Sequence, residues 1–533
     1  CMDDREEGFR RHLETINPDI ETFGAAGFFA VAMDWKGLDD EQLTPLCPIV
    51  VTPAHAVHEV PQAGQEKTHQ KHKQRRNIRI ALRQTFLNYT RRNFLSNLLL
   101  ISHSAPFGLL SLLGKSFVPG SWAKLYNLFR RLVDKQVATE LLIHAKTAKP
   151  AESHELQLGF TYEEMANRVA GFLHTIGLVK NFSSLIILMG HGSSSLNNPH
   201  LAAYDCGACS GRHGGPNARA FANMANRPQV RKLLAEQGIE IPDSSWFIGA
   251  EHNTGNEDIL WFDRELIPYQ HNVNLAKVQM QLSEAQRHSA HERSRRFAST
   301  PDKISHDKAY QHVVTRGVDF SQARPELGHA TNAAAIIGRR NISQGVFFDR
   351  RTFLISYDPS IDPEGRVLEN ILLNAGPVGA GINLEYYFST VNNDGYGCGS
   401  KITHNIIGNF GILDGTRSDL RTGLPTQMIE IHEAMRLQVV VESKVDIVTE
   451  IYNRQPVLQE LIGNGWLLVS VKDYEQATIH IFDPVDGFIE WQSTAAQLPT
   501  IEKSIEWYQG YSGPRTPALL SKPGRANTGE QHA

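Results

Sequence analysis

The alternation of apolar and polar positions predicts a helix and a buried strand beside two polar motifs. Phe9, Leu13 and Ile16 follow the polar start of the chain at spacings of four and three, which is the period of an amphipathic helix. Residues 185–189 form a short, wholly apolar run, as in a buried strand of a parallel sheet. A glycine follows this run, so we expect His191 just past the carboxyl end of the strand, where α/β sheets place their ligands.

The same pattern divides the chain into a core, an insertion and a C-terminal domain. Residues 160–178 read as an amphipathic helix with Thr161 as its N-cap and Glu164 three positions later. After Thr331, the strand-like segments GVFFD, FLISYD, GWLLVSV and ATIHIFD alternate with helical stretches, which is typical of an α+β domain. We predict an α/β protein with a parallel-sheet core, a helical insertion and a C-terminal α+β domain. The predicted ranges are 1–60 and 156–330 for the two parts of the core, 61–155 for the insertion, and 331–533 for the last domain.

The insertion combines a basic stretch with an apolar one. Residues 67–92 are rich in Lys and Arg and have a helical pattern, and residues 93–114 are mainly apolar. Polar residues and Pro106 interrupt the apolar part, so this segment is a poor candidate for a membrane-spanning helix. Three interpretations stay open: a true span, two buried helices around a break at Pro106, or a surface that meets a membrane or a membrane-bound partner.

Composition limits the classes of function. The 533 residues include 53 Lys and Arg against 57 Asp and Glu, so no strong positive field favours nucleic acid, and we expect no nucleic-acid partner. Five cysteines are few and odd in number, which argues against a disulfide framework and for a reducing compartment. The chain begins at Cys1, within its most informative motif, and we interpret it as a fragment of a longer protein.

Two motifs that lie far apart in the sequence carry residue types that bind zinc in proteins. In the first, C-M-D-D-R, Cys1 and Asp3 lie two positions apart, and Arg5 on the same face can hold Asp3 by a bidentate ion pair. The second offers His191 and, fifteen residues later, Cys206. Neither pair forms a closed site alone, whereas together they supply two thiolates, an imidazole and a carboxylate to one zinc ion.

Other interpretations of these motifs have less support. Cys206 and Cys209 form a C-x-x-C pair, but a zinc ribbon needs a second such pair and none is present. The string GHGSSS lacks the G-x-S-x-G spacing of a nucleophilic serine, and no phosphate-binding G-x-x-x-x-G-K-[ST] occurs. Asp205, His213, His252 and Asn253 either orient the ligands or have ordinary structural roles. A polar cluster at 404–433 is a functional surface or a set of structural ion pairs.

Longer segments resemble one protein family. Cys-x-Asp-x-Arg with a strand-end His and a later Cys is similar to the ligand pattern of β-carbonic anhydrases, although there the His and second Cys lie closer together. CMDDREEGFRRHLE, GHGSSSLNNPHLAAYDCGACSGRHGGPNAR and HNIIGNFGILDGTRSDLRTGLPTQMIEIHE resemble the DabA family, the zinc subunits of bacterial inorganic carbon transporters. The resemblance covers essentially the whole chain, and members of that family extend further at the N-terminus.

The resemblance implies a site and a function. It implies Zn²⁺ bound by Cys1, Asp3, His191 and Cys206, with Arg5 as the partner of Asp3, in a β-carbonic-anhydrase-like core. It further implies a peripheral protein on the cytoplasmic side of the cell inner membrane, in complex with DabB, a membrane subunit that translocates cations.

The expected activity is hydration of CO2 to bicarbonate, coupled to a cation gradient. Zinc makes hydroxide available at neutral pH, and a water position opens only when one ligand leaves. Asp3 is the ligand we expect to leave, because Arg5 offers its carboxylate another partner. Two rival hypotheses are a stand-alone β-type carbonic anhydrase and a non-catalytic zinc scaffold.

Overall fold

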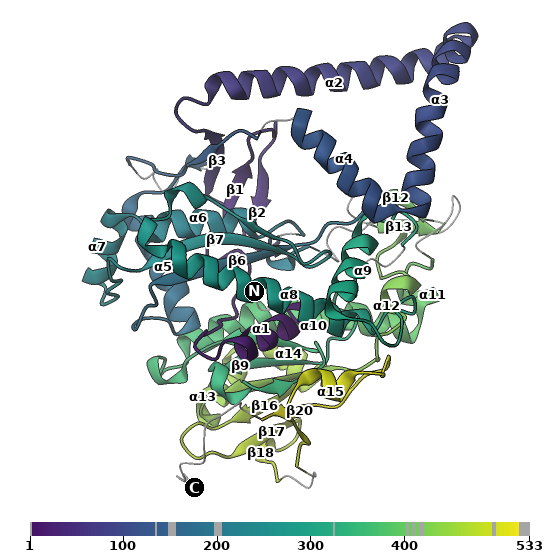
Figure 1. Ribbon diagram of the computed structural model, residues 1–533. Coiled ribbons are helices and arrows are strands. Elements are labelled where there is room, and N and C mark those ends of the chain that lie inside the picture. Colours follow the sequence, from purple (N-terminus) through teal and green to yellow (C-terminus); the bar gives the residue numbers. More distant parts are fainter. Residues whose placement is uncertain are drawn as a thin grey trace.

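The computed structural model describes residues 3–133, 136–147, 156–196, 205–209, 211–322, 326–400, 404–407, 411–414, 420–492 and 497–521. It has two units built on β-sheets, one above the other in Figure 1, and an arm of three helices at the top. Helix α1 (Arg5–Ile16) lies between the two units, near the middle of the molecule. The N-terminal helix is thus enclosed by segments that lie far from it in the sequence.

The upper unit contains two sheets. The first has the order β2-β1-β3-β4, with β5 beside β3, and consists of β1 (Met33–Lys36), β2 (Thr44–Leu46), β3 (His55–Pro61), β4 (Thr139–Leu142) and β5 (Gln157–Leu158). The second has the order β6-β7-β8, and consists of β6 (Leu185–Gly192), β7 (Trp246–Asn253) and β8 (Ile259–Trp261). Strands β6 and β7 are parallel, and β8 runs antiparallel to β7.

Helices pack on these sheets around the largest apolar core. They are α5 (Tyr162–Ile176), α6 (Gly215–Ala225) and α7 (Pro228–Glu236), followed along the chain by α8 (Asn272–Ser294) and α9 (His306–Val318). Val31, Phe160, Phe221 and Phe247 join the sheets and helices in one buried cluster, so they share a continuous core. Helix α5 begins with the predicted capping box, in which Thr161 and Glu164 satisfy each other's backbone N–H groups.

The strand that carries His191 is parallel, as predicted, but longer than expected. Pairing with β7 continues through His191, opposite His252, and Gly192, opposite Asn253. His191 is therefore one of the last residues of strand β6 and does not lie beyond its end. The apolar run 185–189 is mostly half-buried, and the buried residues Gly190, His191 and Gly192 follow it. The backbone pairing that extends the strand depends on a segment about 60 residues away.

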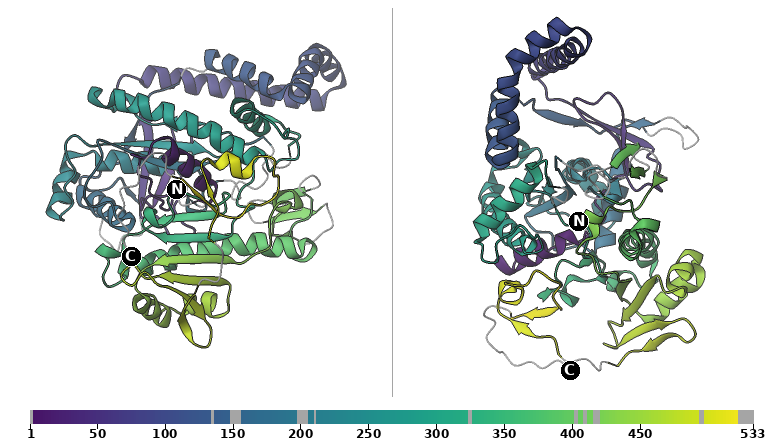
Figure 2. Two further views of the ribbon diagram at one scale, coloured as in Figure 1. Left: turned by 60° about the horizontal axis from the view of Figure 1, so that its bottom comes forward. Right: turned by 90° about the vertical axis from the view of Figure 1, so that its right-hand side faces the viewer.

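The arm consists of α2 (Glu66–Arg92), α3 (Phe94–Phe117) and α4 (Pro119–Val133) and extends beyond the upper unit (Figures 1 and 2). Asn93 caps α3 by accepting hydrogen bonds from Leu95 and Ser96. Pro106 lies inside α3 without ending it, so the interpretation as two buried helices around a break is wrong. Within the described part of the chain, α3 is the one helix long and apolar enough to cross a membrane, and it is exposed.

The lower unit contains a six-stranded sheet in the order β11-β9-β15-β16-β17-β18, of which the first four strands are parallel. Its strands are β9 (Ala334–Gly338), β11 (Thr352–Ser356), β15 (Leu437–Glu442), β16 (Leu467–Lys472), β17 (Ile479–Asp483) and β18 (Gly487–Glu490). Helices α10 (Arg366–Val391), α13 (Val445–Arg454) and α14 (Pro456–Gly463) bury a second apolar cluster against it. The strand-like segments predicted after Thr331 fall on strands of this unit.

Smaller elements complete the fold. They are β10 (Val346–Phe347), β12 (His404–Ile407), β13 (Gly411–Asp414), β14 (Leu420–Arg421), β19 (Thr500–Ile501), β20 (Ala518–Leu520), α11 (Asn393–Tyr396), α12 (Thr426–Ile429), α15 (Ser504–Tyr508), and the 3-10 turns η2 (Gly207–Cys209), η3 (Arg264–Leu266), η4 (Tyr269–His271), η5 (Arg340–Ile342) and η6 (Pro359–Ile361). The fold class is thus mixed α/β with parallel strands in several sheets. A β-carbonic-anhydrase-like core and the four predicted domain ranges stay predictions.

Candidate metal centre

Helix α1 is buried although half of its residues are charged. Ten of its 12 residues are buried, and Phe9 and Leu13, with the partly buried Ile16, form the apolar contacts that the helical pattern predicts. The charged residues are paired instead: Arg11 is 2.8 Å from a carboxylate oxygen of Glu7 and 2.8 Å from one of Glu292. Buried charges are tolerated when they are paired and hydrogen-bonded in this way. The helix is therefore held by ion pairs more than by apolar contacts.

The same helix connects the two units of the molecule. Arg340, from the lower unit, pairs with Glu14 at 2.8 Å. Arg11 donates a hydrogen bond to Ser504 Oγ at 2.7 Å, across 493 residues of sequence. These contacts fix the axis of α1, so the residues just before it have a defined position in the interior.

Asp3 and Arg5 form the bidentate ion pair that their spacing suggests. Arg5 Nε donates to Asp3 Oδ1 at 2.9 Å, and Arg5 Nη2 donates to Asp3 Oδ2 at 2.8 Å. The remaining guanidinium nitrogen, Nη1, donates to Glu326 Oε1 at 2.9 Å. All three side chains are at most 5% exposed. Arg5 is thus held between two buried carboxylates.

Strand β6 brings His191 to this ion pair. His191 Nε2 lies 3.4 Å from Asp3 Oδ2 and 3.0 Å from Arg5 Nη2. The carbonyl of His191 accepts a hydrogen bond from the backbone of Gly214 at 2.8 Å. Gly190 makes the approach possible, because a Cβ at this position would lie 2.4 Å from the Gly214 carbonyl. The strand therefore needs glycine next to His191 to pack on the start of α6.

Cys206 lies in a tight turn that presents its sulfur to the same region. Its carbonyl accepts hydrogen bonds from the backbone N–H groups of Cys209 and Gly211, and its own N–H donates to the carbonyl of Arg212. The thiol of Cys209 bonds with Cys206 and lies 3.7 Å from Asn217 Oδ1. Cys209 is therefore a neighbour of the Cys206 sulfur, and its exclusion from the ligand set stays a prediction.

The electrostatics favour the ionised forms of Cys206 and Asp3. The hydrogen bond from Cys209, together with the charge of His191, lowers the pKa of Cys206 to about 6 despite burial. Burial raises the pKa of Asp3, but the charges of Arg5, His329 and His191 together outweigh it and hold that pKa well below its usual value. The charges of both Asp3 and His191 act on the Cys206 thiol. Asp3 and His191 are therefore close enough to Cys206 to affect its ionisation.

The structure adds His329, which sequence reasoning missed. Its Nδ1 bonds with Asp4 Oδ1, and its Nε2 lies 3.5 Å from Asp3 Oδ2. One ligand atom from each of these three residues lies within 4.8 Å of the others. No motif spacing links residues 4 and 329, so only the fold could reveal the contact.

Asp3 consequently belongs to two possible donor sets. With His191 and Cys206 it offers a carboxylate, an imidazole and a thiolate, which is the mixture that zinc prefers. With Asp4 and His329 it offers two carboxylates and an imidazole, but the bond between Asp4 and His329 already occupies one atom of each. The chemistry of the first set suits zinc, whereas among the described residues it is the second set whose ligand atoms lie within 4.8 Å of one another. Asp4 Oδ2 is buried without a hydrogen-bond partner among the described residues.

The other predicted residues have varied surroundings. Cys1, the fourth predicted ligand, lies outside the described residues. Asp205 accepts a hydrogen bond from the backbone of Ser193 at 2.7 Å, just after His191. His213 pairs with Glu251 at 2.7 Å, and this hydrogen bond raises the pKa of His213 to about 9 despite burial.

His252 and part of the 404–433 cluster take part in ion pairs. His252 lies between two buried carboxylates, with Glu6 at 3.1 Å and Glu257 at 2.8 Å. Burial lowers the pKa of His252, but these carboxylates outweigh it and raise the pKa to about 10. Glu433 pairs with Arg351, which is a structural ion pair; residues 401–403, 408–410 and 415–419 of that region lie outside the described part.

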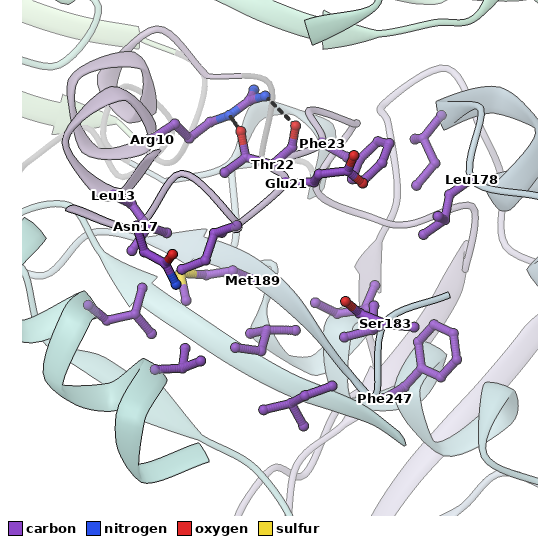
Figure 3. A pocket seen from close by; sticks show the side chains of 18 of the residues that line it. Arg10, Leu13, Asn17, Glu21, Thr22, Phe23, Leu178, Ser183, Met189 and Phe247 are labelled. Atoms are coloured by element: carbon purple, nitrogen blue, oxygen red, sulfur yellow. Dashed lines mark hydrogen bonds between the residues drawn. The ribbon is translucent and has the colours of Figure 1, made fainter. Parts of the chain in front are cut away.

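A cavity of about 750 Å³ lies beside the centre, between α1 and strand β6. Figure 3 shows Leu13 and Arg10 of α1 on one side of it and Met189 of β6 on another, with Phe247 at the far end. Arg10 turns its guanidinium to Thr22, with which it forms two hydrogen bonds. Most of the lining is apolar. Since Met189 precedes His191 by two residues, the cavity extends close to the predicted ligands.

Comparisons with known proteins assign the family. The family model described as "Probable inorganic carbon transporter subunit DabA" matches residues 1–467. Proteins of that name from Methylococcus capsulatus and Dechloromonas aromatica are 56% and 52% identical to the chain, over 98% of its length in both cases and 49% and 51% of theirs. A protein of the same name from Azotobacter vinelandii is 38% identical over 93% of the chain and 57% of its own length. The chain spans about half the length of these relatives, and it belongs to the DabA family.

Proposed function

We propose that this chain contains the zinc site of a subunit that hydrates CO2 to bicarbonate within an energy-coupled inorganic carbon pump. The observation that carries the proposal is the contact of Asp3 and His191 with each other and with Arg5, together with the effect of both charges on the Cys206 thiol. Asp3 lies almost 190 positions before His191, and Cys206 lies 15 positions after it, so the fold brings the carboxylate to the imidazole and the thiol. Cys1, two positions before Asp3, would be the fourth ligand.

The donor set suits a hydrolytic metal. A zinc ion held by such residues supplies a Lewis acid that makes hydroxide available near pH 7. The cysteine is prepared for this role, because a pKa of about 6 leaves the Cys206 sulfur largely ionised at neutral pH. The cavity along β6 is largely apolar, which suits an uncharged molecule such as CO2.

Arg5 controls the carboxylate. Arg5 binds both oxygens of Asp3, and in this ion pair the carboxylate would be held away from a zinc ion, which would leave one position for water. Release of Asp3 from Arg5 would let the carboxylate complete the ligand set. Glu326 also accepts a hydrogen bond from Arg5, so the guanidinium would keep one buried partner without Asp3. This exchange is the point at which we expect energy coupling to act.

The names of the relatives support a role in a transport complex. They describe a transporter subunit, and a subunit needs at least one partner. We propose a DabB-like, cation-translocating membrane subunit as that partner, with this protein peripheral on the cytoplasmic side of the inner membrane. Hydration of CO2 would then be driven toward bicarbonate by the cation gradient.

Growth of a carbonic-anhydrase-deficient bacterial strain in air tests this proposal. The full-length protein that contains this chain should restore growth when it is expressed with the membrane partner, and should fail without it. Rescue by the protein alone would favour a stand-alone carbonic anhydrase, and CO2 hydration by the purified protein would support that result. Rescue by the Cys206→Ser variant with the partner would refute the zinc mechanism.

A further inference from the structure

The three-helix arm (residues 66–133) is fixed to the body near both of its ends. In the first part of α2, His72 pairs with Asp39 at 2.9 Å. Lys124 of α4 bonds with Gln311 of α9 at 3.2 Å, and Gly120 lies so close to α9 that a Cβ there would be 2.8 Å from the hydroxyl of Thr315. Away from these contacts, helices α2 and α3 extend beyond the upper unit (Figures 1 and 2). The arm is therefore a defined projection with a large exposed surface.

Helix α3 exposes most of its large apolar side chains and turns half of its polar ones inward. Its less exposed positions are mainly polar or small and follow a helical spacing: Ser96, Asn97, Leu100, Ser104, Ser111 and Gly114. Eleven large apolar side chains of the helix are 44–78% exposed: Phe94, Leu95, Leu98, Leu99, Ile101, Phe107, Leu109, Leu110, Leu112, Leu113 and Phe117. A helix of a water-soluble body has the opposite arrangement. The exposed face of α3 thus fits an apolar environment.

Two exposed polar side chains near the middle of α3 are compatible with an apolar environment. Ser102 Oγ donates to the carbonyl of Leu98 at 2.6 Å, and the His103 ring bonds with the carbonyl of Leu99 at 2.8 Å. Hydrogen bonds of this kind satisfy polar groups inside the helix itself. Lys115 lies in the last turn, where a long cationic side chain can reach the headgroup layer.

The neighbouring helix limits how α3 meets a membrane. Helix α2 contains nine Lys and Arg residues and one Glu. The 24 residues of α3 give a length of about 36 Å, enough to span the roughly 30 Å of a bilayer core. A spanning α3 would, however, draw the attached α2 and its cations through hydrocarbon, which is strongly unfavourable. An orientation in the plane of the membrane surface avoids this cost.

We propose that the arm binds the surface of an anionic lipid bilayer. Helix α3 lies in the interfacial layer with its apolar face toward the acyl chains, and the cations of α2 contact the lipid headgroups. The exposed Leu125, Leu128 and Phe129 of α4 extend the same apolar surface. This inference deepens the proposed function and rests on it for a location at a membrane. The binding itself needs neither zinc nor activity.

Flotation with lipid vesicles tests the proposal. The full chain is mixed with vesicles of phosphatidylcholine containing 0 or about 30% phosphatidylglycerol, a range chosen because cationic segments respond to anionic lipid. A triple variant, Leu98→Gln/Leu109→Gln/Leu112→Gln, should bind the anionic vesicles at least tenfold more weakly. A matched variant at exposed apolar positions of the body, Val273→Gln/Met280→Gln/Val485→Gln, should change binding less than twofold. A Lys71→Gln/Lys73→Gln variant should weaken binding to anionic vesicles only.

The outcomes separate this inference from the zinc proposal. Cys206→Ser should bind vesicles like the parent chain, whatever its effect on growth. The inference is overturned if the parent chain does not float with either vesicle, or if the α3 variant binds as well as the body variant. Retention only on membranes that contain a partner protein would also overturn it, because the apolar face would then be a protein interface.

Discussion

Replacement of Arg5 by methionine should tighten zinc binding and abolish activity at the same time. The substitution removes the two hydrogen bonds that hold Asp3, at 2.9 and 2.8 Å, and keeps most of the side-chain volume. Asp3 is then a buried carboxylate whose nearest cationic partner would be the metal. We therefore expect it to stay on zinc and to keep water away.

The structure gives the size of the effect. A hydrogen bond to a charged group contributes about 1.5–3 kcal/mol, so the two bonds oppose zinc ligation by about 3–6 kcal/mol before other groups adjust. Since a tenfold change in affinity corresponds to about 1.4 kcal/mol, even half of the lower figure gives a tenfold tighter dissociation constant. Glu326 also loses its partner, and an uncompensated buried charge costs about 3–5 kcal/mol of stability. The double variant Arg5→Met/Glu326→Gln should recover part of that stability.

Competition with a chromogenic chelator measures the zinc affinity, and urea denaturation measures stability. Arg10→Met is the control, because Arg10 is a buried arginine of the same helix that bonds with Thr22 and the Leu354 carbonyl. It should lower stability and leave zinc affinity unchanged. Weaker zinc binding in Arg5→Met, or normal CO2-dependent growth with it, would show that Arg5 does not compete with the metal for Asp3.

Three further predictions concern the rest of the centre. Cys206→Ser should lose stoichiometric zinc, since a hydroxyl is a poor zinc ligand, whereas Cys209→Ser should keep it. The zinc content of the two purified variants tests this prediction. The pKa of His252, about 10 against a usual 6.5, means that its ion pairs stabilise fully below pH 6.5 and that this stabilisation is lost as the pH rises through 10. The free energy of unfolding should thus fall between pH 7 and 10 by up to about 4 kcal/mol, and by much less in His252→Gln. Gly190→Ala places a Cβ 2.4 Å from a backbone carbonyl, so it should cost about 1–3 kcal/mol and lower zinc occupancy, whereas Gly171→Ala, with open space around it, should do neither.

The sequence predicts the helix and the strand that carry the centre, but not the residues that surround them. The apolar stripe of Phe9 and Leu13 predicts α1, and an apolar run with a following glycine predicts the parallel strand before His191, because both signals are local. The burial of the charged face of α1 could not be predicted, since it depends on partners such as Glu292 that are 280 residues away. His329 was missed for the same reason.

The arm shows a different limit of sequence reasoning. Pro106 normally interrupts a helix, and the pattern around it suggested a break. In the structure α3 continues through this position, at the cost of one backbone hydrogen bond. The sequence also contains both the apolar and the small polar positions of α3, but which of them face the neighbouring helices depends on how α2 and α4 pack against it.

The long-range contacts of α1 have a consequence for synthesis of the protein. Arg11 finds Glu292 and Ser504 as partners, and the second lies 493 residues later in the chain. At about 5–20 residues per second, the ribosome needs roughly 25–100 s to produce it. During this time a helix whose stability depends on distant carboxylates and hydroxyls has no place to dock. Asp3, the proposed ligand next to it, can therefore take its final position only late in synthesis, so under the zinc proposal the metal should be incorporated after the lower unit has folded.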